Sequence, residues 1–181
     1  MFNYRRVPLL STIIKVFEKV VYKNVFNFLM ENALIYKFQS GFLPGHSTTH
    51  QLIELINEIF MALDNRELIC LIFCDVSKAV DRVWLRGLLL KLERYDIKGN
   101  LLQWLGSYIS AREQQVIIKN AISGKGNHKA GVPQGSILGP LLFMIFINDI
   151  ADETMGLCRP WFIRYLCFFT ITVSTHLLVD Y

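Results

Sequence analysis

The segment Phe73-Cys74-Asp75-Val76-Ser77-Lys78-Ala79-Val80-Asp81 marks the point at which an apolar run stops at a carboxylate. Residues 68–73 form that run, which is rich in β-formers and short enough for a buried strand. Such a strand has no other use for a charge, and hard divalent cations prefer carboxylate oxygens on rigid backbone. Asp75 is therefore a candidate metal ligand. The alternative is that Asp75 or Ser77 only caps the helix that follows.

A glycine-rich turn lies further along the chain, with the sequence Gly131-Val132-Pro133-Gln134-Gly135-Ser136-Ile137-Leu138-Gly139-Pro140. Glycines at this density indicate a backbone that turns sharply and approaches another group closely. Ser136 is a candidate cap for the apolar helix that follows, and the first amides of a helix can bind an anion. An ordinary junction between a loop and a helix is the alternative interpretation.

Apolar periodicity predicts helices on both sides of the strand. The apolar positions that mark the expected helices lie within residues 13–31, 52–63, 88–95, 101–108 and 141–147. The last of these is apolar on all sides and is expected to be buried. On the first helix the apolar positions are Ile13, Phe17, Val20, Val21, Val25 and Phe28, with Lys15, Glu18, Lys19 and Lys23 between them. The row of Lys15, Lys19 and Lys23 is a candidate contact for a nucleic-acid backbone, and the alternative, which we favour, is an ordinary solvated helix face.

The helix boundaries and the remaining strands follow from local signals. Thr48 with Gln51 predicts a capping box at the start of the second helix. Residues 115–119 read as a strand, residues 123–127 as a turn and residues 129–132 as a returning strand.

The composition bounds the class of protein. A chain of 181 residues can form one domain or a piece of a larger one. It is 52% hydrophobic and only 19% charged, which excludes a disordered chain. A net charge of +4 permits phosphate binding but does not demand it. The four cysteines form no C-x-x-C pair. That pattern predicts an intracellular protein, nuclear or cytoplasmic and not secreted.

The carboxylate segment and the glycine turn together resemble the palm of a reverse transcriptase of the non-LTR retrotransposon kind, as found in jockey-like mobile elements. The resemblance covers residues 3–150 and includes a fingers-like loop over residues 39–48. It implies an α+β fold, with helical fingers on part of the antiparallel palm sheet of a right-hand polymerase. The thumb and the Asp-Asp palm hairpin are expected to be missing. We therefore expect a partial reverse transcriptase domain over residues 1–150 and a divergent apolar C-terminal tail over residues 151–181.

The match to the first palm motif implies specific roles. Asp75 corresponds to the catalytic carboxylate that binds both metal ions, and the backbone carbonyl of Val76 corresponds to a further ligand. The implied cofactor is Mg²⁺, with two ions about 4 Å apart. Val80 stands where the family usually carries an aromatic residue beneath the incoming sugar, which predicts weaker discrimination against ribonucleotides. Asp81 matches an acid for which we expect a structural task.

The match to the second palm motif implies that Pro133, Gln134 and Gly135 lie against the incoming nucleotide and the template base. In the fingers-like loop, Leu43 stands where the family usually carries an arginine that faces the triphosphate. A leucine cannot donate a hydrogen bond, so we expect weaker nucleotide binding.

The family pattern also predicts an Asp-Asp pair in the tail, but residues 154–179 contain no acid. One aspartate cannot hold two close dications against their mutual repulsion, so most of the catalysis should be lost. The cleanest apolar run in the tail, residues 165–173, is about half of the roughly 20 residues that a membrane-spanning helix needs. We therefore expect no membrane partner.

Three functions are compatible with these observations. The first is a fragment of an RNA-directed DNA polymerase, a nucleotidyltransferase by ancestry that is inert as this chain. The second is a non-catalytic nucleic-acid-binding remnant, and the third is a product with no selected function. The resemblance implies an RNA template, a DNA primer and deoxynucleotide triphosphates as partners. The sequence leaves the oligomeric state open.

Overall fold

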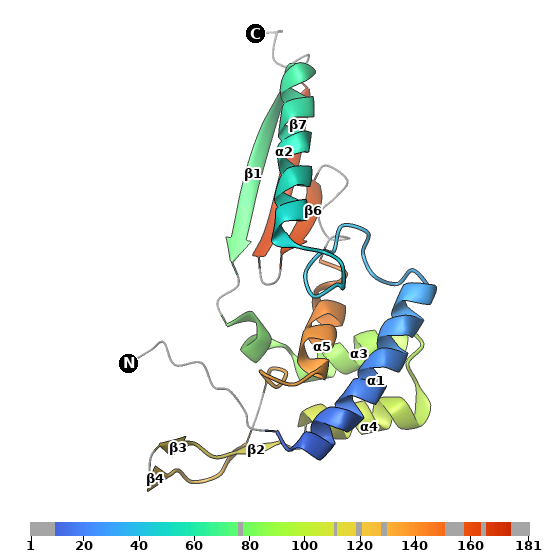
Figure 1. Cartoon of the computed structure of the whole chain (residues 1–181), viewed down its shortest axis with the longest axis vertical. Helices are drawn as coiled ribbons and strands as arrows, with labels where there is room; N and C mark the ends of the chain where they lie inside the picture. The colour runs from blue at the N-terminus through green and yellow to red at the C-terminus, as the bar shows by residue number, and fades with distance from the viewer. Residues whose placement is uncertain are drawn as a thin grey trace. The chain divides into compact units, whose positions relative to one another are not determined.

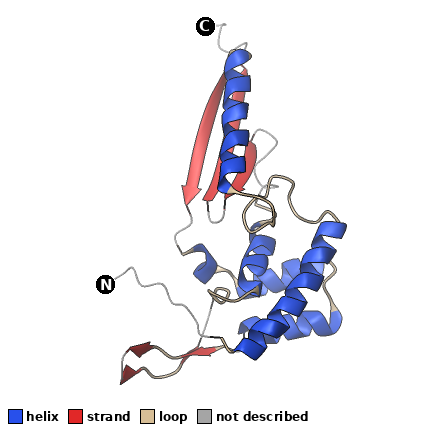
Figure 2. Cartoon of the chain, viewed as in Figure 1, coloured by secondary structure: helices blue, strands red, loops and turns tan. Residues whose placement is uncertain are grey.

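The structure is a computed structural model that describes residues 10–75, 78–110, 112–118, 121–127, 130–150, 158–163 and 166–174. The chain divides into two compact units that alternate along the sequence. The first unit joins Met1–Leu34 to Lys78–Phe146, and the second joins Ile35–Ser77 to Ile147–Tyr181. Figure 1 labels the helices and strands, and Figure 2 separates them by type.

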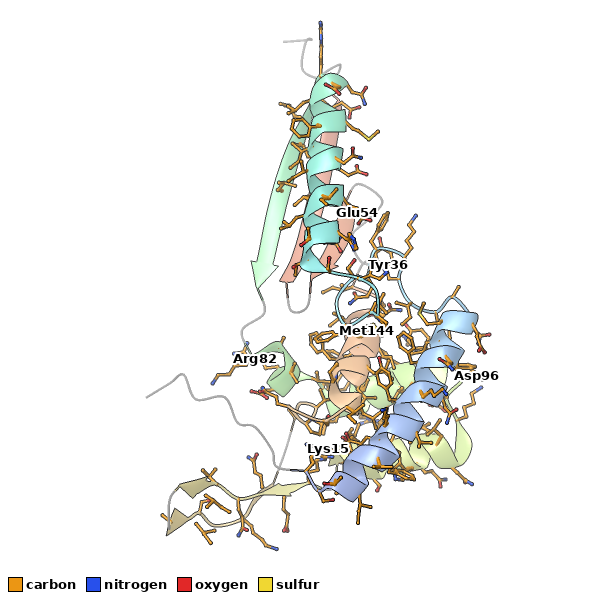
Figure 3. The ribbon with its side chains drawn as sticks, in the orientation of Figure 1. Lys15, Tyr36, Glu54, Arg82, Asp96 and Met144 are labelled. Atoms are coloured by element: carbon orange, nitrogen blue, oxygen red, sulfur yellow. The ribbon has the colours of Figure 1, made fainter. Side chains whose placement is uncertain are left out.

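The first unit is mainly helical. Its elements are α1 (Thr12–Glu31), the 3₁₀ turn η1 (Ala79–Arg82), α3 (Leu85–Arg94), α4 (Gly99–Ser110) and α5 (Leu138–Ile147). Helix α5 lies among α1, α3 and α4 (Figure 1) and supplies much of the core. Its side chain Met144, labelled in Figure 3, is almost completely buried. The predicted burial on all sides is therefore confirmed for residues 141–145, whereas Phe146 and Ile147 are half-buried.

Helix α1 begins after Ser11, which caps it, and ends at Glu31 with Asn32 as its C-cap, at the predicted boundary. The predicted buried face was only partly right. Val21 and Val25 are buried, whereas Ile13, Phe17 and Val20 are 83%, 52% and 56% exposed. The buried stripe instead consists of Glu18, Val21, Val25 and Leu29. Glu18 can lie in this buried stripe because its carboxylate has hydrogen-bond partners inside the unit.

Short strands extend from α4. Strand β2 (Glu113–Gln114) pairs with β5 (Gly126–Asn127), and β3 (Ile117–Ile118) pairs with β4 (Ala121–Ile122). The predicted turn over residues 123–127 was wrong at its end, because Gly126 and Asn127 belong to a strand. The chain already reverses direction between β3 and β4. Of the predicted returning strand, Val132 lies in a loop and Lys129 lies outside the described residues.

The second unit consists of helix α2 (Thr48–Asp64) and an antiparallel sheet, with strand order β1-β7-β6. The strands are β1 (Glu67–Asp75), β6 (Cys158–Ile163) and β7 (Leu166–Ser174). Helix α2 packs against β1. Its cap is Ser47, whose hydroxyl accepts a hydrogen bond from the His50 amide, so the predicted capping box at Thr48 was wrong by one residue.

The tail of the chain supplies the centre of this sheet. Strand β7 pairs with all of β1, from Glu67 opposite Ser174 to Asp75 opposite Leu166, and with β6 on its other edge. The antiparallel sheet confirms the predicted α+β class. We predicted no strand in this tail, because its longer apolar run is equally typical of a buried helix or of part of a membrane segment. Within the described ranges, no helix has both the length and the apolar character needed to cross a bilayer.

Candidate functional site

The glycine-rich turn lies beside η1, at the end of the first motif. The Gly131 amide donates to the Val83 carbonyl over 2.9 Å, and the Val132 amide donates to the Val80 carbonyl over 3.0 Å. These two bonds hold the two predicted motifs side by side within the first unit. Val80 is half-buried, whereas Val132 and Val83 are buried.

Gly131 is required by this close approach. Its φ of +90° lies in the left-handed region, and a Cβ placed on it would lie 2.7 Å from the Asp81 Cα atom. Gly139 has the same lack of space, since a Cβ there would lie 2.7 Å from the Pro133 carbonyl oxygen. The predicted close approach is confirmed, and the group approached is the backbone of the chain itself.

Gln134 contacts the first motif through its side chain. Its Nε2 atom donates to Oδ1 of Asp81 over 2.8 Å. Pro133, the residue before it, is buried, and Gly135, the residue after it, is exposed. The structure therefore brings Val80, Pro133, Gln134 and Gly135 together in one unit.

The start of α5 is closed by side chains of the protein. The Ser136 hydroxyl accepts from the Gly139 amide over 2.9 Å, as predicted for a cap, and donates to the Pro133 carbonyl over 2.8 Å. The Ile137 amide donates to Oε2 of Glu18 over 2.7 Å. Pro140 has no amide hydrogen to offer. The anion bound at this helix N-terminus is therefore the protein's own carboxylate, contrary to the expectation of amides open to a ligand.

Glu18 is the main residue of this region that the sequence analysis missed. It is 0% exposed, and its Oε1 atom accepts from the Tyr108 hydroxyl over 2.6 Å. Burial, together with the hydrogen bond to Glu18, raises the pKa of Tyr108 well above its usual value. Glu18 was assigned to the solvated positions because it stands among lysines. Its helical spacing with Val21 and Val25 was the signal that could have identified it.

Asp75 belongs to the second unit, at the last residue of β1, and only its backbone is described. Val76, the predicted second ligand, lies outside the described residues. Asp75 is therefore not one of the residues that the first unit brings together. In the sheet, Asp75 is opposite Leu166 of β7, and Leu166 is opposite Ile163 of β6.

The donor set around Asp75 does not fit a pair of divalent ions. The strands that neighbour β1 in the sheet are β7 and then β6, and neither contains an aspartate or a glutamate. In the described part of the chain, no three His, Cys, Asp or Glu side chains gather as they would around a metal ion. The expectation that the palm hairpin is missing was therefore wrong for its backbone, because β6 and β7 form a hairpin beside β1, although the sequence of the two strands contains no acid.

The fingers-like loop is organised by its own hydrogen bonds. Gln39 is buried and its Nε2 atom donates to the Gly41 carbonyl, while the Ser40 hydroxyl lies 3.1 Å from Nδ1 of His46. Leu43 is half-buried, and its carbonyl accepts from the His46 amide. The loop is therefore ordered without the arginine that the family usually carries at position 43.

The helices and antiparallel sheet define a right-hand polymerase fold. Two solved structures of telomerase from Candida tropicalis share it. The complex with the TWJ fragment of telomeric RNA matches with a TM-score of 0.62 and 13% identity, over 93% of this chain and 30% of that one. The apo form matches with a TM-score of 0.58 and 14% identity, over 85% of this chain and 33% of that one. At such identities the likeness shows the fold alone.

The chain belongs to the reverse transcriptase family. Residues 1–173 match the family described as reverse transcriptase (RNA-dependent DNA polymerase). The chain is thus part of a reverse transcriptase domain of the kind found in retrotransposon RNA-directed DNA polymerases. Reverse transcriptases as a family use divalent metal ions and bind RNA templates.

Three Drosophila melanogaster proteins are among its curated relatives. The probable RNA-directed DNA polymerase from transposon X-element is 36% identical over 155 residues, and that from transposon BS is 35% identical over 148 residues. The RNA-directed DNA polymerase from mobile element jockey is 34% identical over 152 residues. These matches cover 86%, 82% and 84% of this chain but only 17%, 16% and 16% of the relatives. The predicted resemblance to jockey-like elements is confirmed.

Proposed function

We propose that this chain is a fragment of a retrotransposon RNA-directed DNA polymerase that no longer catalyses nucleotidyl transfer. The observation that carries the proposal is the strand order of the second unit. The strands nearest to Asp75 in the sheet contribute no carboxylate. A two-metal reaction needs several hard oxygen ligands on rigid backbone to hold two dications close together. Asp75 and the Val76 carbonyl are the remaining candidates for Mg²⁺, and they are too few.

The nucleotide- and template-facing part is better preserved. We assign Val80, Pro133, Gln134 and Gly135 to contacts with the nucleotide and the template base. The hydrogen bonds from Val132 to Val80 and from Gln134 to Asp81 support this assignment, since they hold the loop against the first motif. The corresponding partners are an RNA template, a DNA primer and deoxynucleotide triphosphates. Binding without synthesis is the function that the geometry supports best.

The two parts of the chain differ in how closely they follow the reverse transcriptase family. We assign residues 1–150 to the partial reverse transcriptase domain and residues 151–181 to a tail whose side chains diverge from the family. The family match reaches residue 173, which supports a tail that keeps its pairing with β1 while its acids are lost. The cysteine pattern supports an intracellular location, in the nucleus or the cytoplasm.

Primer extension tests the proposal. The full chain, a primed RNA template, deoxynucleotide triphosphates and Mg²⁺ should give no extended primer above the level of an Asp75→Ala control. DNA synthesis by the wild-type chain that disappears in Asp75→Ala would refute the loss of catalysis. Fluorescence anisotropy with the same primed template tests the retained binding. It should show an affinity that falls steeply as salt rises, because phosphate contacts release counterions.

A further inference from the structure

Asp81 is held in place from several directions. Its amide donates to the Lys78 carbonyl over 2.9 Å within η1, and the backbone at Asp81 forms the wall against which Gly131 packs. Its carboxylate accepts the Gln134 side chain. The next residue, Arg82, is exposed and extends away from η1 (Figure 3). Asp81 thus offers a fixed acceptor at the base of the glycine-rich turn.

The chemistry of this contact sets the direction of the Gln134 amide. An ionised carboxylate only accepts hydrogen bonds, whereas a primary amide has a donating and an accepting end. Only the nitrogen end of Gln134 can therefore face Asp81. The carbonyl oxygen Oε1 must then be directed elsewhere, together with the second amide hydrogen. A neutral partner with both donor and acceptor atoms would impose no such choice.

We propose that Asp81 is a positioning residue that fixes the orientation of the Gln134 amide, so that Gln134 presents its carbonyl oxygen to a hydrogen-bond donor on the template strand. This inference rests on the proposed contact between Gln134 and the template. The donor is either a sugar hydroxyl or a base amine. The first exists only in an RNA template, whereas the second is present in RNA and DNA templates alike.

A double-mutant cycle on binding tests the coupling. The full-length chain and its Asp81→Ala, Gln134→Ala and doubly substituted variants are titrated with a fluorescent primed RNA template at fixed salt. Each single substitution should weaken binding about three- to tenfold, as expected for one hydrogen bond. The double variant should bind no more weakly than either single variant, because Asp81 acts through Gln134. Loss of an acid from the surface would by itself strengthen binding to phosphates, and Asp64→Ala, an exposed acid on α2, is the control for that effect.

The Asp81→Asn variant tests whether Asp81 fixes the orientation of the Gln134 amide or only holds the Gln134 side chain in place. Asparagine keeps an acceptor for Gln134 but adds a donor, so both amide orientations become available. We expect a melting temperature close to that of the wild type with an intermediate loss of affinity. Full affinity in Asp81→Asn would overturn the inference, because support alone would then suffice. A repeat with a DNA template of the same sequence identifies the donor. A loss restricted to RNA indicates the sugar hydroxyl, and an equal loss indicates a base amine.

The remaining outcomes are distinguishable. If Gln134→Ala weakens binding but Asp81→Ala does not, the inference about Asp81 is wrong and the proposed function of the loop stands. Additive losses in the double variant have the same meaning. A wild-type chain that does not bind the primed template, or binding that is indifferent to Gln134→Ala, overturns the proposed function of the loop and this inference with it.

Discussion

Replacing Glu18 with alanine should loosen the start of α5 and destabilise the first unit. The wild-type carboxylate accepts from the Ile137 amide over 2.7 Å and from the Tyr108 hydroxyl over 2.6 Å, and it is 0% exposed. Hydrogen bonds to a charged group contribute about 1.5–3 kcal/mol each, so the two bonds amount to about 3–6 kcal/mol. Burial of the carboxylate costs several kcal/mol in the opposite direction.

The net effect follows from what the substitution leaves behind. In Glu18→Ala the buried amide of Ile137 and the hydroxyl of Tyr108 lose their acceptor, which costs about 1–3 kcal/mol for each donor. Removal of the desolvated charge offsets part of this cost, so we expect a loss of about 2–4 kcal/mol in the free energy of unfolding. Glu18→Gln keeps a carbonyl oxygen for Ile137 and should lose only about 1–2 kcal/mol.

Urea unfolding followed by tryptophan fluorescence measures these values. Lys19→Ala is the matched control, because Lys19 is the exposed neighbour of Glu18 on the same helix. Hydrogen exchange at the Ile137 amide gives a local readout, and exchange should accelerate in Glu18→Ala. If Glu18→Ala is as stable as Lys19→Ala and the Ile137 amide exchanges at the wild-type rate, then the carboxylate does not hold this helix and the reasoning is refuted.

Four further outcomes are expected. Because the pKa of Tyr108 is raised in the folded state, its contribution to the free energy of unfolding is fully present below about pH 10. Above that pH the contribution is lost by up to about 1.4 kcal/mol per pH unit. The melting temperature should therefore fall less steeply between pH 9 and 11 in Tyr108→Phe than in the wild type. Gly131→Ala should cost more than about 2 kcal/mol in thermal unfolding, because it combines a left-handed φ with a clash against backbone, whereas Gly124→Ala, in open space, should cost much less. Gln51→Met should raise the free energy of unfolding by about 1–2 kcal/mol, since both polar atoms of the buried Gln51 amide lack hydrogen-bond partners among the described residues. An unchanged or lower midpoint would contradict this. At high protein concentration the isolated chain should sediment as aggregates, because α1 and α2 expose large apolar side chains. A monodisperse monomer with one cooperative transition at that concentration would disprove this.

The long helices and the strand bearing Asp75 could be predicted from the sequence because their periodicity extends over many residues. The errors of prediction have two causes: one depends on local backbone conformation, and the other on contacts between residues distant in the sequence. The cap of α2 was predicted at Thr48 but is Ser47, because serine and threonine both suit the N-cap position and only the backbone conformation distinguishes the two sites. Glu18 was assigned to the wrong face because its partners, Tyr108 and Ile137, are distant in the sequence, and no local pattern announces them.

The candidate site shows the same division. The glycines and Pro133 indicated a close approach, and this was right. The partner of that approach, the backbone at Asp81, is set by tertiary structure and could not be read from the turn itself. The strands of the tail were more difficult to predict. Strand β7 pairs on both edges, and an apolar run of that kind is equally typical of a buried helix or of part of a membrane segment.

The glycine-rich turn can keep its structure when catalysis is lost, because the turn and the strands that would supply metal ligands belong to different units. The glycine-rich turn is held by Glu18, Asp81 and the backbone of residues 80–83, all within the first unit. The acids that a metal pair requires would have to come from the strands beside β1, in the second unit. Among the described residues, the hydrogen bonds named above for the loop involve none of those strands. Substitutions in the tail can therefore remove the metal ligands and leave the loop intact, and binding should persist after synthesis is lost.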